Sequence, residues 1–214
     1  MSFKLYYHPL SSFCQKALIA LYENDLPFDG EITDVASDAG RAAFAKIWPL
    51  CRFPVLRDAA RGQTIPESSI IIEYLQQHAP GQIKLIPSNP ERALEVRRWD
   101  RFFDLDINTP MGKVMTDRLR PAGQNDSYGV AQAKAQIATA YQVLDAALAG
   151  KTWAAGDDFT MADCAAAPAL FYGNMIVPFG DHRKIAAYYQ RLAARPSCTR
   201  VVSEAEPYLK LMPR

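Results

Sequence analysis

Two adjacent serines near the N-terminus stand where a strand-like segment passes into a helix-like one. Ser11 and Ser12 follow an aromatic-rich run that ends at Pro9, and either hydroxyl can cap the helix that comes next. A serine hydroxyl at a helix N-terminus can also donate a hydrogen bond to a bound sulfur, and the helix dipole adds positive potential there. Both effects favour the thiolate and lower the pKa of a thiol, which is about 8.5 when unperturbed. Ser11 therefore suits the activation of a bound thiol, and its role as a plain helix cap is the competing interpretation.

Three neighbouring side chains compete with Ser11 for that role. Tyr7 brings a hydroxyl to the end of the strand, although aromatic strand residues usually pack in the core. Ser12 takes over if the junction is shifted by one residue, and we rank Ser11 first, Tyr7 second and Ser12 third. Cys14 would indicate thiol–disulfide chemistry if it were exposed with a lowered pKa. It shares an apolar helix face with Ala17, however, and this predicts burial.

Two other segments carry residues suited to holding a ligand. Glu67 and Ser68 open a helix-like pattern, where free N–H groups and the positive end of the dipole can hold a carboxylate. Plain capping is the other interpretation. Phe53 precedes Pro54, and a cis X-Pro bond costs only about 0.5–1 kcal/mol. Such a bond turns the preceding amide and carbonyl outwards to grip a peptide, whereas an ordinary strand start after a trans proline is the alternative.

The hydrophobic pattern divides the chain into a mixed first part and a helical second part. The first part predicts strands over 3–8, 28–35, 53–56 and 63–65, with helices over 12–24, 38–47 and 68–79 between or after them. A proline-rich segment over 80–90 reads as a linker. Beyond it, helices are predicted over 91–119, 128–149, 160–174 and 182–194, with a short one after Pro196. The order predicts an α/β unit followed by an all-α unit.

Composition narrows the classes of function. The 214 residues are 49% hydrophobic and 22% charged, with a net charge of +1, which is ordinary for a soluble globular protein and gives no reason to expect nucleic acid or a membrane as partner. No signal peptide or membrane-spanning segment is recognisable. The four cysteines form no CxxC pair, so no metal site is expected. Few, scattered cysteines suit a reducing compartment, and we expect a cytoplasmic protein.

The chain resembles the cytosolic glutathione transferases over essentially its whole length. The resemblance rests on four separated motifs whose order and spacing matter more than any one of them. They are His8-Pro9-Leu10-Ser11-Ser12, Phe53-Pro54-Val55-Leu56, Glu67-Ser68-Ser69-Ile70-Ile71-Ile72-Glu73-Tyr74-Leu75, and Ala155-Gly156-Asp157-Asp158-Phe159-Thr160-Met161-Ala162-Asp163. The likeness is to the serine-type, bacterial-like members, with the subclass open. It implies a thioredoxin-like domain over 1–79, a linker over 80–90, and an all-α domain over 91–214 that forms the pocket for an electrophile.

Each motif residue then has an implied role toward glutathione. The main chain of Phe53 would pair with the cysteinyl part, with Pro54 in the cis form. Ser68 would hold the α-carboxylate of the γ-glutamyl end, and Glu67 would help to hold its ammonium group. Ser11 would stabilise the thiolate, and Tyr7 occupies the position that tyrosine-type classes use.

The expected function is transfer of glutathione, as cosubstrate, to small apolar electrophiles by a homodimer. The same scaffold also supports isomerases, thiol or peroxide reductases and non-enzymatic binding proteins, which stay open. The two serines resemble the junction of zeta-like isomerases, although Phe13 stands where those have cysteine. Candidates for the electrophile pocket, with an apolar core stripe as the alternative for each, are Phe103, Met111, Val114, Met115 and Arg118.

The chain also departs from the family pattern. Members usually have Asn-Pro-x-Gly before the cis proline, but this chain has Trp48 and Cys51 at the first and fourth of these positions. Arg52 could reach the glycine carboxylate of glutathione or could simply be a solvated arginine. Thr160 and Asp163 predict a capping box, and we expect a structural role for Asp163 and no part in catalysis.

Overall fold

The computed structural model describes residues 3–212 and begins with a four-stranded sheet. Its strands are β1 (Phe3–Tyr7), β2 (Phe28–Ile32), β3 (Val55–Asp58) and β4 (Gln63–Pro66), in the spatial order β2-β1-β3-β4. β1 runs parallel to β2 and antiparallel to β3, and β3 pairs with β4 as a hairpin. The predicted strands are confirmed, and the parallel pair needs the crossover that the helix after β1 supplies.

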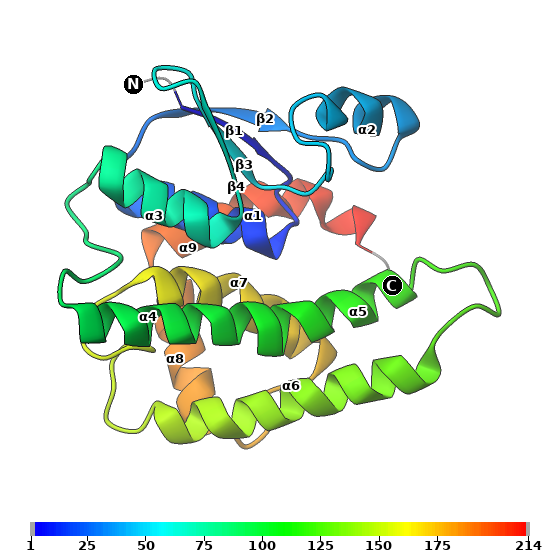
Figure 1. Cartoon of the computed structure of the whole chain (residues 1–214). Coiled ribbons are helices and arrows are strands. Elements are labelled where there is room, and N and C mark those ends of the chain that lie inside the picture. The colour runs from blue at the N-terminus through cyan, green and yellow to red at the C-terminus, as the bar shows by residue number, and fades with distance from the viewer. Residues whose placement is uncertain (1–2, 213–214) are drawn as a thin grey trace.

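Three helices cover the two faces of this sheet, as Figure 1 shows. They are α1 (Ser12–Glu23), α2 (Asp38–Ala45) and α3 (Ser68–His78). Successive β1 residues point to opposite faces: Leu5 packs in the core with α1 and α3, whereas Tyr6 packs against Phe44 of α2. This is the thioredoxin-like unit that the sequence predicts.

The rest of the described chain is helical. It contains α4 (Pro90–Phe102), the π-helical segment η1 (Phe103–Asn108), α5 (Thr109–Asp117), α6 (Ser127–Ala147), α7 (Met161–Ile176), α8 (Arg183–Ala193), α9 (Pro196–Ala205) and the 3₁₀ segment η2 (Glu206–Leu211). The predicted architecture, a thioredoxin-like domain followed by an all-helical domain, is thus confirmed. No helix within residues 3–212 is long and apolar enough to cross a membrane.

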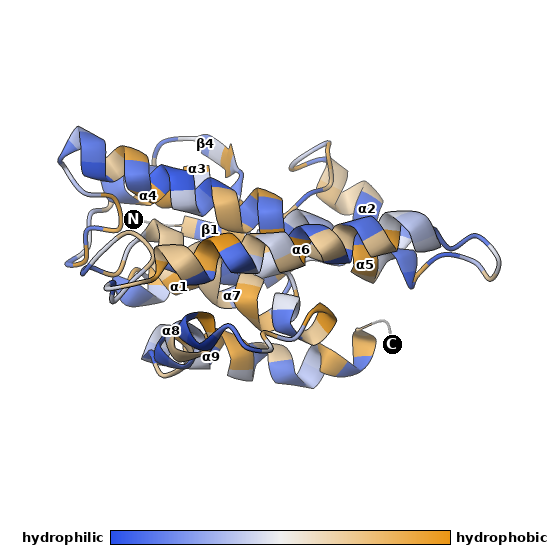
Figure 2. Ribbon diagram, turned by 90° about the horizontal axis from the view of Figure 1, so that it is seen from below, coloured by the Kyte–Doolittle hydropathy of each residue, from blue (hydrophilic) through white to orange (hydrophobic). Residues whose placement is uncertain are grey.

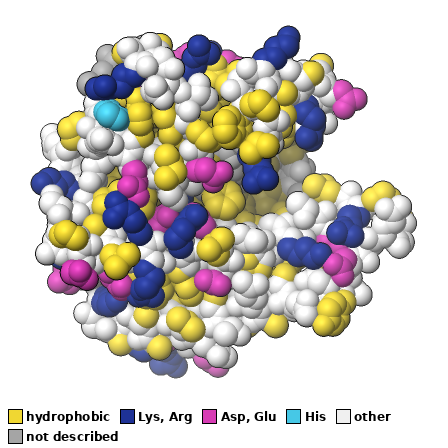
Figure 3. All heavy atoms as spheres, viewed as in Figure 1, with side chains coloured by type: hydrophobic (Ala, Val, Ile, Leu, Met, Phe, Trp, Pro, Cys, Tyr) yellow, Lys and Arg dark blue, Asp and Glu magenta, His cyan; other side chains and the backbone are white. Residues whose placement is uncertain are grey.

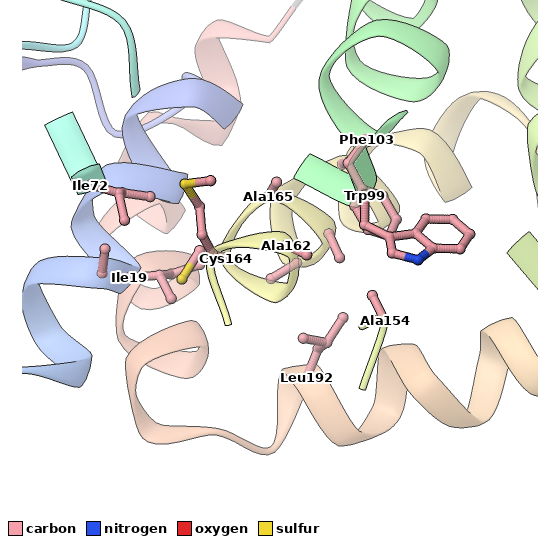
Figure 4. Packing of buried hydrophobic residues seen from close by; sticks show 14 of the residues in the cluster. Ile19, Ile72, Trp99, Phe103, Ala154, Ala162, Cys164, Ala165 and Leu192 are labelled. Atoms are coloured by element: carbon pink, nitrogen blue, oxygen red, sulfur yellow. The ribbon is translucent and has the colours of Figure 1, made fainter. Parts of the chain in front are cut away.

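Helix α7 forms the centre of the helical unit. Of its 16 residues, 12 are buried, most of them with small or apolar side chains. Figure 2 shows hydrophobic colour along α7, whereas α4 is largely hydrophilic. Figure 4 shows Ala162, Cys164 and Ala165 of α7 between Ile19 of α1 on one side and Trp99 of α4 on the other. The core is therefore continuous from the sheet unit into the helical unit.

One helix differs from its prediction. The sequence pattern predicts an unbroken helix over 91–119, but the backbone widens into a π-helical segment at Phe103–Asn108 before α5 begins. Pro110 has no N–H for the helix ladder, and the Thr109 hydroxyl donates instead to the Asp104 carbonyl at 2.9 Å. π-helical segments often occur at functional sites, and this one lies beside the cavity described next.

Candidate active site

A cavity of about 270 Å³ lies between the sheet unit and the helical unit. Its walls come from the turn before β3, the start of α3, the first turn of α1 and the start of α5. They comprise Phe13, Trp48, Arg52, Phe53, Pro54, Pro66, Glu67, Ser68 and Thr109. Figure 3 shows the molecule hollowed between its upper, sheet-containing part and the α5 end of the long helical arm. All four residues that the resemblance assigns to glutathione binding line this one cavity.

The Phe53–Pro54 bond is cis, as the resemblance implies. It lies just before Val55, the first residue of β3, which pairs with Tyr6 of β1. Phe53 therefore lies outside the paired part of the sheet. None of the hydrogen bonds within residues 3–212 involves the main chain of Phe53, which leaves its N–H and C=O available to an extended ligand. The Phe53 ring stacks against the His8 ring, with ring centroids 6.2 Å apart.

The start of α3 is an open helix end. Glu67, at the N-cap position, adopts φ +69°, which is rare for a residue other than glycine, and its side chain makes no capping hydrogen bond. The first bond of the helix is the one that Ile71 N–H donates to the Glu67 carbonyl at 2.8 Å. The N–H groups before it therefore have no acceptor within the helix. Ser68 is 4% exposed and lines the cavity at this end. The geometry is that of an anion site.

Ser11 caps α1 through its hydroxyl oxygen. The Ser11 hydroxyl oxygen accepts from the Cys14 N–H at 3.3 Å, so the capping interpretation holds. The cap uses the oxygen as acceptor, and the hydroxyl hydrogen is shared with the Cys14 thiol, because a side-chain hydrogen bond from Ser11 lowers the pKa of Cys14 against the larger effect of burial. To activate a bound ligand, the hydroxyl would turn its hydrogen from Cys14 to that ligand. Ser11 is half-buried and does not line the cavity itself, whereas Phe13, in the same helical turn, does.

The three competing side chains are less well placed. The Tyr7 ring packs over Gly30 of β2, so that a Cβ on Gly30 would lie 3.1 Å from its Cε1, and burial raises the pKa of Tyr7. β2 is the sheet edge away from β3 and the cis turn. Cys14 is completely buried, and burial raises its pKa to about 12, so it is neither exposed nor ionised. Ser12 is also buried.

The rings of His8 and Tyr208, called the aromatic roof below, cover the strand-to-helix junction. The His8 ring lies edge-on to Tyr208 of η2, with centroids 5.5 Å apart, so the C-terminal segment closes over the first loop. His8 Nδ1 accepts from the Leu10 N–H at 3.2 Å, and burial lowers the pKa of His8 against an opposing effect of Asp34. The imidazole therefore keeps its neutral form to a lower pH than a free histidine.

Two family models match the chain. One describes the glutathione S-transferase N-terminal domain and matches residues 5–82. The other describes the glutathione S-transferase C-terminal domain and matches residues 108–196. Together they span well over half of the sequence, in the order in which the two structural units occur. The chain belongs to the glutathione S-transferase family.

Individual family members are distant in sequence and similar in fold. Glutathione S-transferase GstB of Escherichia coli K12 is 26% identical over 198 residues, which cover 90% of this chain and 93% of that protein. A probable maleylacetoacetate isomerase of Caenorhabditis elegans is 27% identical over 173 residues, 79% of this chain and 78% of the isomerase. A glutathione S-transferase of Methylobacterium radiotolerans, solved in complex with glutathione sulfonate, is 29% identical with a TM-score of 0.79, covering 94% of this chain and 95% of that one.

In this member of the family, a buried lysine joins the two units behind the open helix end. Lys16 of α1 is fully buried, and its Nζ lies 2.6 Å from Asp100 of α4, 2.8 Å from Asp104 of η1 and 2.8 Å from the Ser69 hydroxyl of α3. The Ser69 hydroxyl donates to Asp100 at 2.7 Å. Burial raises the pKa of Asp104, and Lys16 opposes the rise. The network fixes the residue next to Ser68 and so holds the anion site in place.

None of the residues predicted for the electrophile pocket lines the cavity between the sheet unit and the helical unit. Phe103, Met111 and Val114 are buried in the core, as the alternative interpretation held, while Met115 is half-buried and Arg118 is exposed. The wall instead includes four residues that sequence reasoning did not select as site residues, namely Phe13, Trp48, Pro66 and Thr109. The proline at 110 was the available signal for Thr109, because it predicts a disturbed helix there.

The capping box predicted at Thr160 and Asp163 has a structural role. The Asp163 carboxylate accepts from the Thr160 N–H at 2.8 Å, the Thr160 hydroxyl at 3.0 Å, the Ala154 N–H at 3.0 Å and the Tyr188 hydroxyl at 2.6 Å. Asp163 is completely buried in the helical unit and does not line the cavity. The capping box is therefore confirmed.

Proposed function

We propose that the protein is a glutathione transferase, which conjugates the thiolate of glutathione to small apolar electrophiles. The observation that carries this proposal is a single cavity whose wall combines an unpaired main chain at Phe53 with an uncapped helix end at Ser68. A peptide with a free α-carboxylate matches both features, since one pairs with its backbone and the other with its charge. Glutathione has both features, and a solved relative carries glutathione sulfonate.

The binding roles follow from the position of each group in the wall. Phe53 pairs with the cysteinyl residue of glutathione, next to Pro54. The N–H groups at the start of α3 and the Ser68 hydroxyl hold the α-carboxylate, while the exposed Glu67 carboxylate faces its ammonium group. Arg52, also in the wall, is available to the glycine carboxylate at the other end.

Thiol activation falls to Ser11 in this proposal. The hydroxyl hydrogen of Ser11 turns from Cys14 and donates to the glutathione sulfur, the α1 dipole adds positive potential, and the thiol proton leaves to solvent. The thiolate then attacks the electrophilic carbon, so that an S–C bond forms as the bond to a leaving group breaks with its electron pair, or as a double bond opens and is protonated. Ser11 is not acylated at any stage.

The two units divide the work. We assign glutathione binding to a domain over 1–79, connected by a linker over 80–90 to a helical domain over 91–214 that supplies the apolar electrophile pocket. A role in detoxification in the cytoplasm fits the four free cysteines. A homodimer fits the exposed apolar side chains of Ile70, Leu94 and Leu105, which are 52%, 63% and 53% exposed on α3, α4 and η1.

The decisive experiment is a pH titration of glutathione thiolate absorbance on the wild type, Ser11→Ala and Ser12→Ala. We expect bound glutathione to ionise at least about one pH unit below the free thiol at 8.5, and this shift to disappear in Ser11→Ala alone. Calorimetry confirms that both variants still bind glutathione. Loss of the shift in Ser12→Ala alone, or in Tyr7→Phe, would move activation to that hydroxyl. Absence of glutathione binding in the wild type would contradict the enzymatic proposal and favour a non-enzymatic binding protein.

A glutathione-dependent isomerase is the second candidate, because the chain has a relative that is a probable maleylacetoacetate isomerase and a two-serine junction. An isomerase returns glutathione unchanged, whereas a transferase consumes it. Product analysis with equimolar glutathione and a diketo diacid that has one cis carbon–carbon double bond separates the two. A thiol or peroxide reductase working through Cys14 is disfavoured, since burial raises the pKa of that thiol to about 12 and keeps it protonated.

A further inference from the structure

A second cavity, of about 160 Å³, lies between α1, α7, α8 and α9. It shares no lining residue with the glutathione cavity. The largest side chains in its wall are two partly buried aromatic rings and three aliphatic groups. These are Phe171, Tyr189, Leu192, Val201 and Val202.

The sequence explains why the helices leave a gap here. α7 contributes Ala167 and Pro168 to the wall, and α8 contributes Ala193. These small side chains fill less of the space between the helices than larger ones would. Pro168 lies inside α7, has no N–H to donate and pushes its ring against the preceding turn. The gap is therefore built into the backbone and does not depend on one mobile side chain.

Two polar side chains of the wall, Gln15 and Thr199, are hydrogen-bonded within the protein, whereas the Tyr189 hydroxyl has no hydrogen bond among residues 3–212. Gln15 Nε2 donates to the Pro9 carbonyl at 2.8 Å and to the Tyr172 hydroxyl at 3.0 Å. The Thr199 hydroxyl lies 2.9 Å from the Ala193 carbonyl. Burial raises the pKa of Cys198 to about 12, so this thiol is neutral, and no Asp, Glu, Lys or Arg lines the cavity. A charged ligand would lose its hydration without gaining a charged partner.

We propose that this cavity is a second binding site, for a small uncharged aromatic molecule of about one ring. A cavity of roughly 150 Å³ with apolar walls is known to hold benzene, so the volume fits one ring and excludes a glutathione conjugate. Phe171 and Tyr189 offer ring faces and edges for aromatic contact. The Gln15 amide is held by its two hydrogen bonds, so this part of the wall is formed before a ligand binds. A preformed wall lowers the entropy cost of binding.

Fluorobenzene is a suitable probe, followed by ¹⁹F NMR on the full-length protein saturated with glutathione sulfonate. We expect saturable binding with a Kd of about 0.1–1 mM for a ligand with so few heavy atoms. Ala193→Phe places a ring at the cavity wall and should weaken binding at least about tenfold. Ala194→Phe is the matched control, because Ala194 is exposed at the same helix end as Ala193 but does not line the cavity. The Kd of this control should equal that of the wild type. Thermal melts of both variants verify the fold.

Three outcomes would overturn the assignment. They are the absence of saturable binding to the wild type, equal loss of binding in both variants, and no loss in a folded Ala193→Phe, which would place the probe elsewhere, such as in the electrophile pocket. None of these outcomes bears on the proposed transferase activity, because the glutathione cavity is occupied throughout and is tested separately by the thiolate titration.

Discussion

Two helices of this protein begin in opposite ways. At the start of α7, Asp163 accepts hydrogen bonds from the Thr160 N–H and hydroxyl, the Ala154 N–H and the Tyr188 hydroxyl, all of them buried. At the start of α3, Glu67 stands in a strained conformation, no side chain caps the helix, and Glu67 and Ser68 line a cavity.

The difference separates stability from binding. A closed helix end satisfies its donors inside the protein and contributes to the free energy of folding. An open end forgoes that contribution and retains donors for a ligand, and its backbone strain is tolerated because the surroundings fix it. The start of α1 is intermediate: the Ser11 oxygen accepts from the Cys14 N–H, while its hydroxyl hydrogen bonds only a neutral thiol, that of Cys14. The predictions below test this division, from the largest expected effect to the smallest.

Asp163→Ala should cause the largest effect. The substitution leaves the Ala154 and Thr160 N–H groups and the Tyr188 hydroxyl buried without an acceptor, and each such group costs about 1–3 kcal/mol. We expect the free energy of unfolding to fall by at least about 3 kcal/mol, measured by urea denaturation. The fraction that stays folded should bind glutathione as the wild type does. A loss below about 1 kcal/mol would show that the closed cap contributes little.

Ser68→Ala tests the open end and should show the reverse pattern. The Ser68 hydroxyl makes no hydrogen bond within residues 3–212 but, as proposed, donates to a carboxylate of the ligand. A hydrogen bond to a charged group contributes about 1.5–3 kcal/mol. The Kd for glutathione should therefore rise about 10–100-fold in calorimetry, while the free energy of unfolding changes by less than about 1 kcal/mol. Ser203→Ala, at an exposed site on α9, is the control. Equal Kd values for the two variants would rule out Ser68 as a ligand.

The sequence predicted the repetitive and local features well. The strands, the helices, the cis turn and the capping box each depend on a few neighbouring residues, so pattern and motif locate them. Phe53 and Ser68 were assigned from motifs, and the fold brings them to one cavity.

Long-range contacts could not be predicted from the sequence pattern. Lys16 lies in a helix pattern that identifies its neighbours as core, but nothing in that pattern pairs it with Asp104, which is 88 residues away. Lys16 is fully buried because α1 meets α3, α4 and η1 there. Its role in joining the two units depends on the same contacts. The π-helical segment escaped for a related reason: periodicity fixes which face of a helix is buried, not the insertion of one extra residue per turn.

Glu67 tests whether strain and binding are linked at the open end. Glu67→Gly removes a side chain from φ +69°, a conformation that glycine adopts freely. Relief of strain should outweigh the added entropy of the unfolded chain and raise the free energy of unfolding by about 1 kcal/mol, while the Kd for glutathione rises. Glu67→Gln separates the two effects, because it keeps the strain and removes the charge. It should weaken binding without any gain in stability, and a similar gain in both variants would contradict the argument.

The smallest effect concerns the aromatic roof over the start of α1. Burial lowers the pKa of His8 in the folded state, so the unfolded chain takes up a proton first as the pH falls. The free energy of unfolding should therefore decrease as the pH drops through the ordinary histidine value of about 6.5. His8→Gln lacks this contribution. Between about pH 7.5 and 5, we expect the Tm of the wild type to fall further than that of His8→Gln by no more than about 2 °C. All other titrating groups are common to both proteins, so parallel Tm curves would mean that His8 is not held neutral against Phe53 and Tyr208, and that the roof is open at the junction where Ser11 is proposed to meet the sulfur.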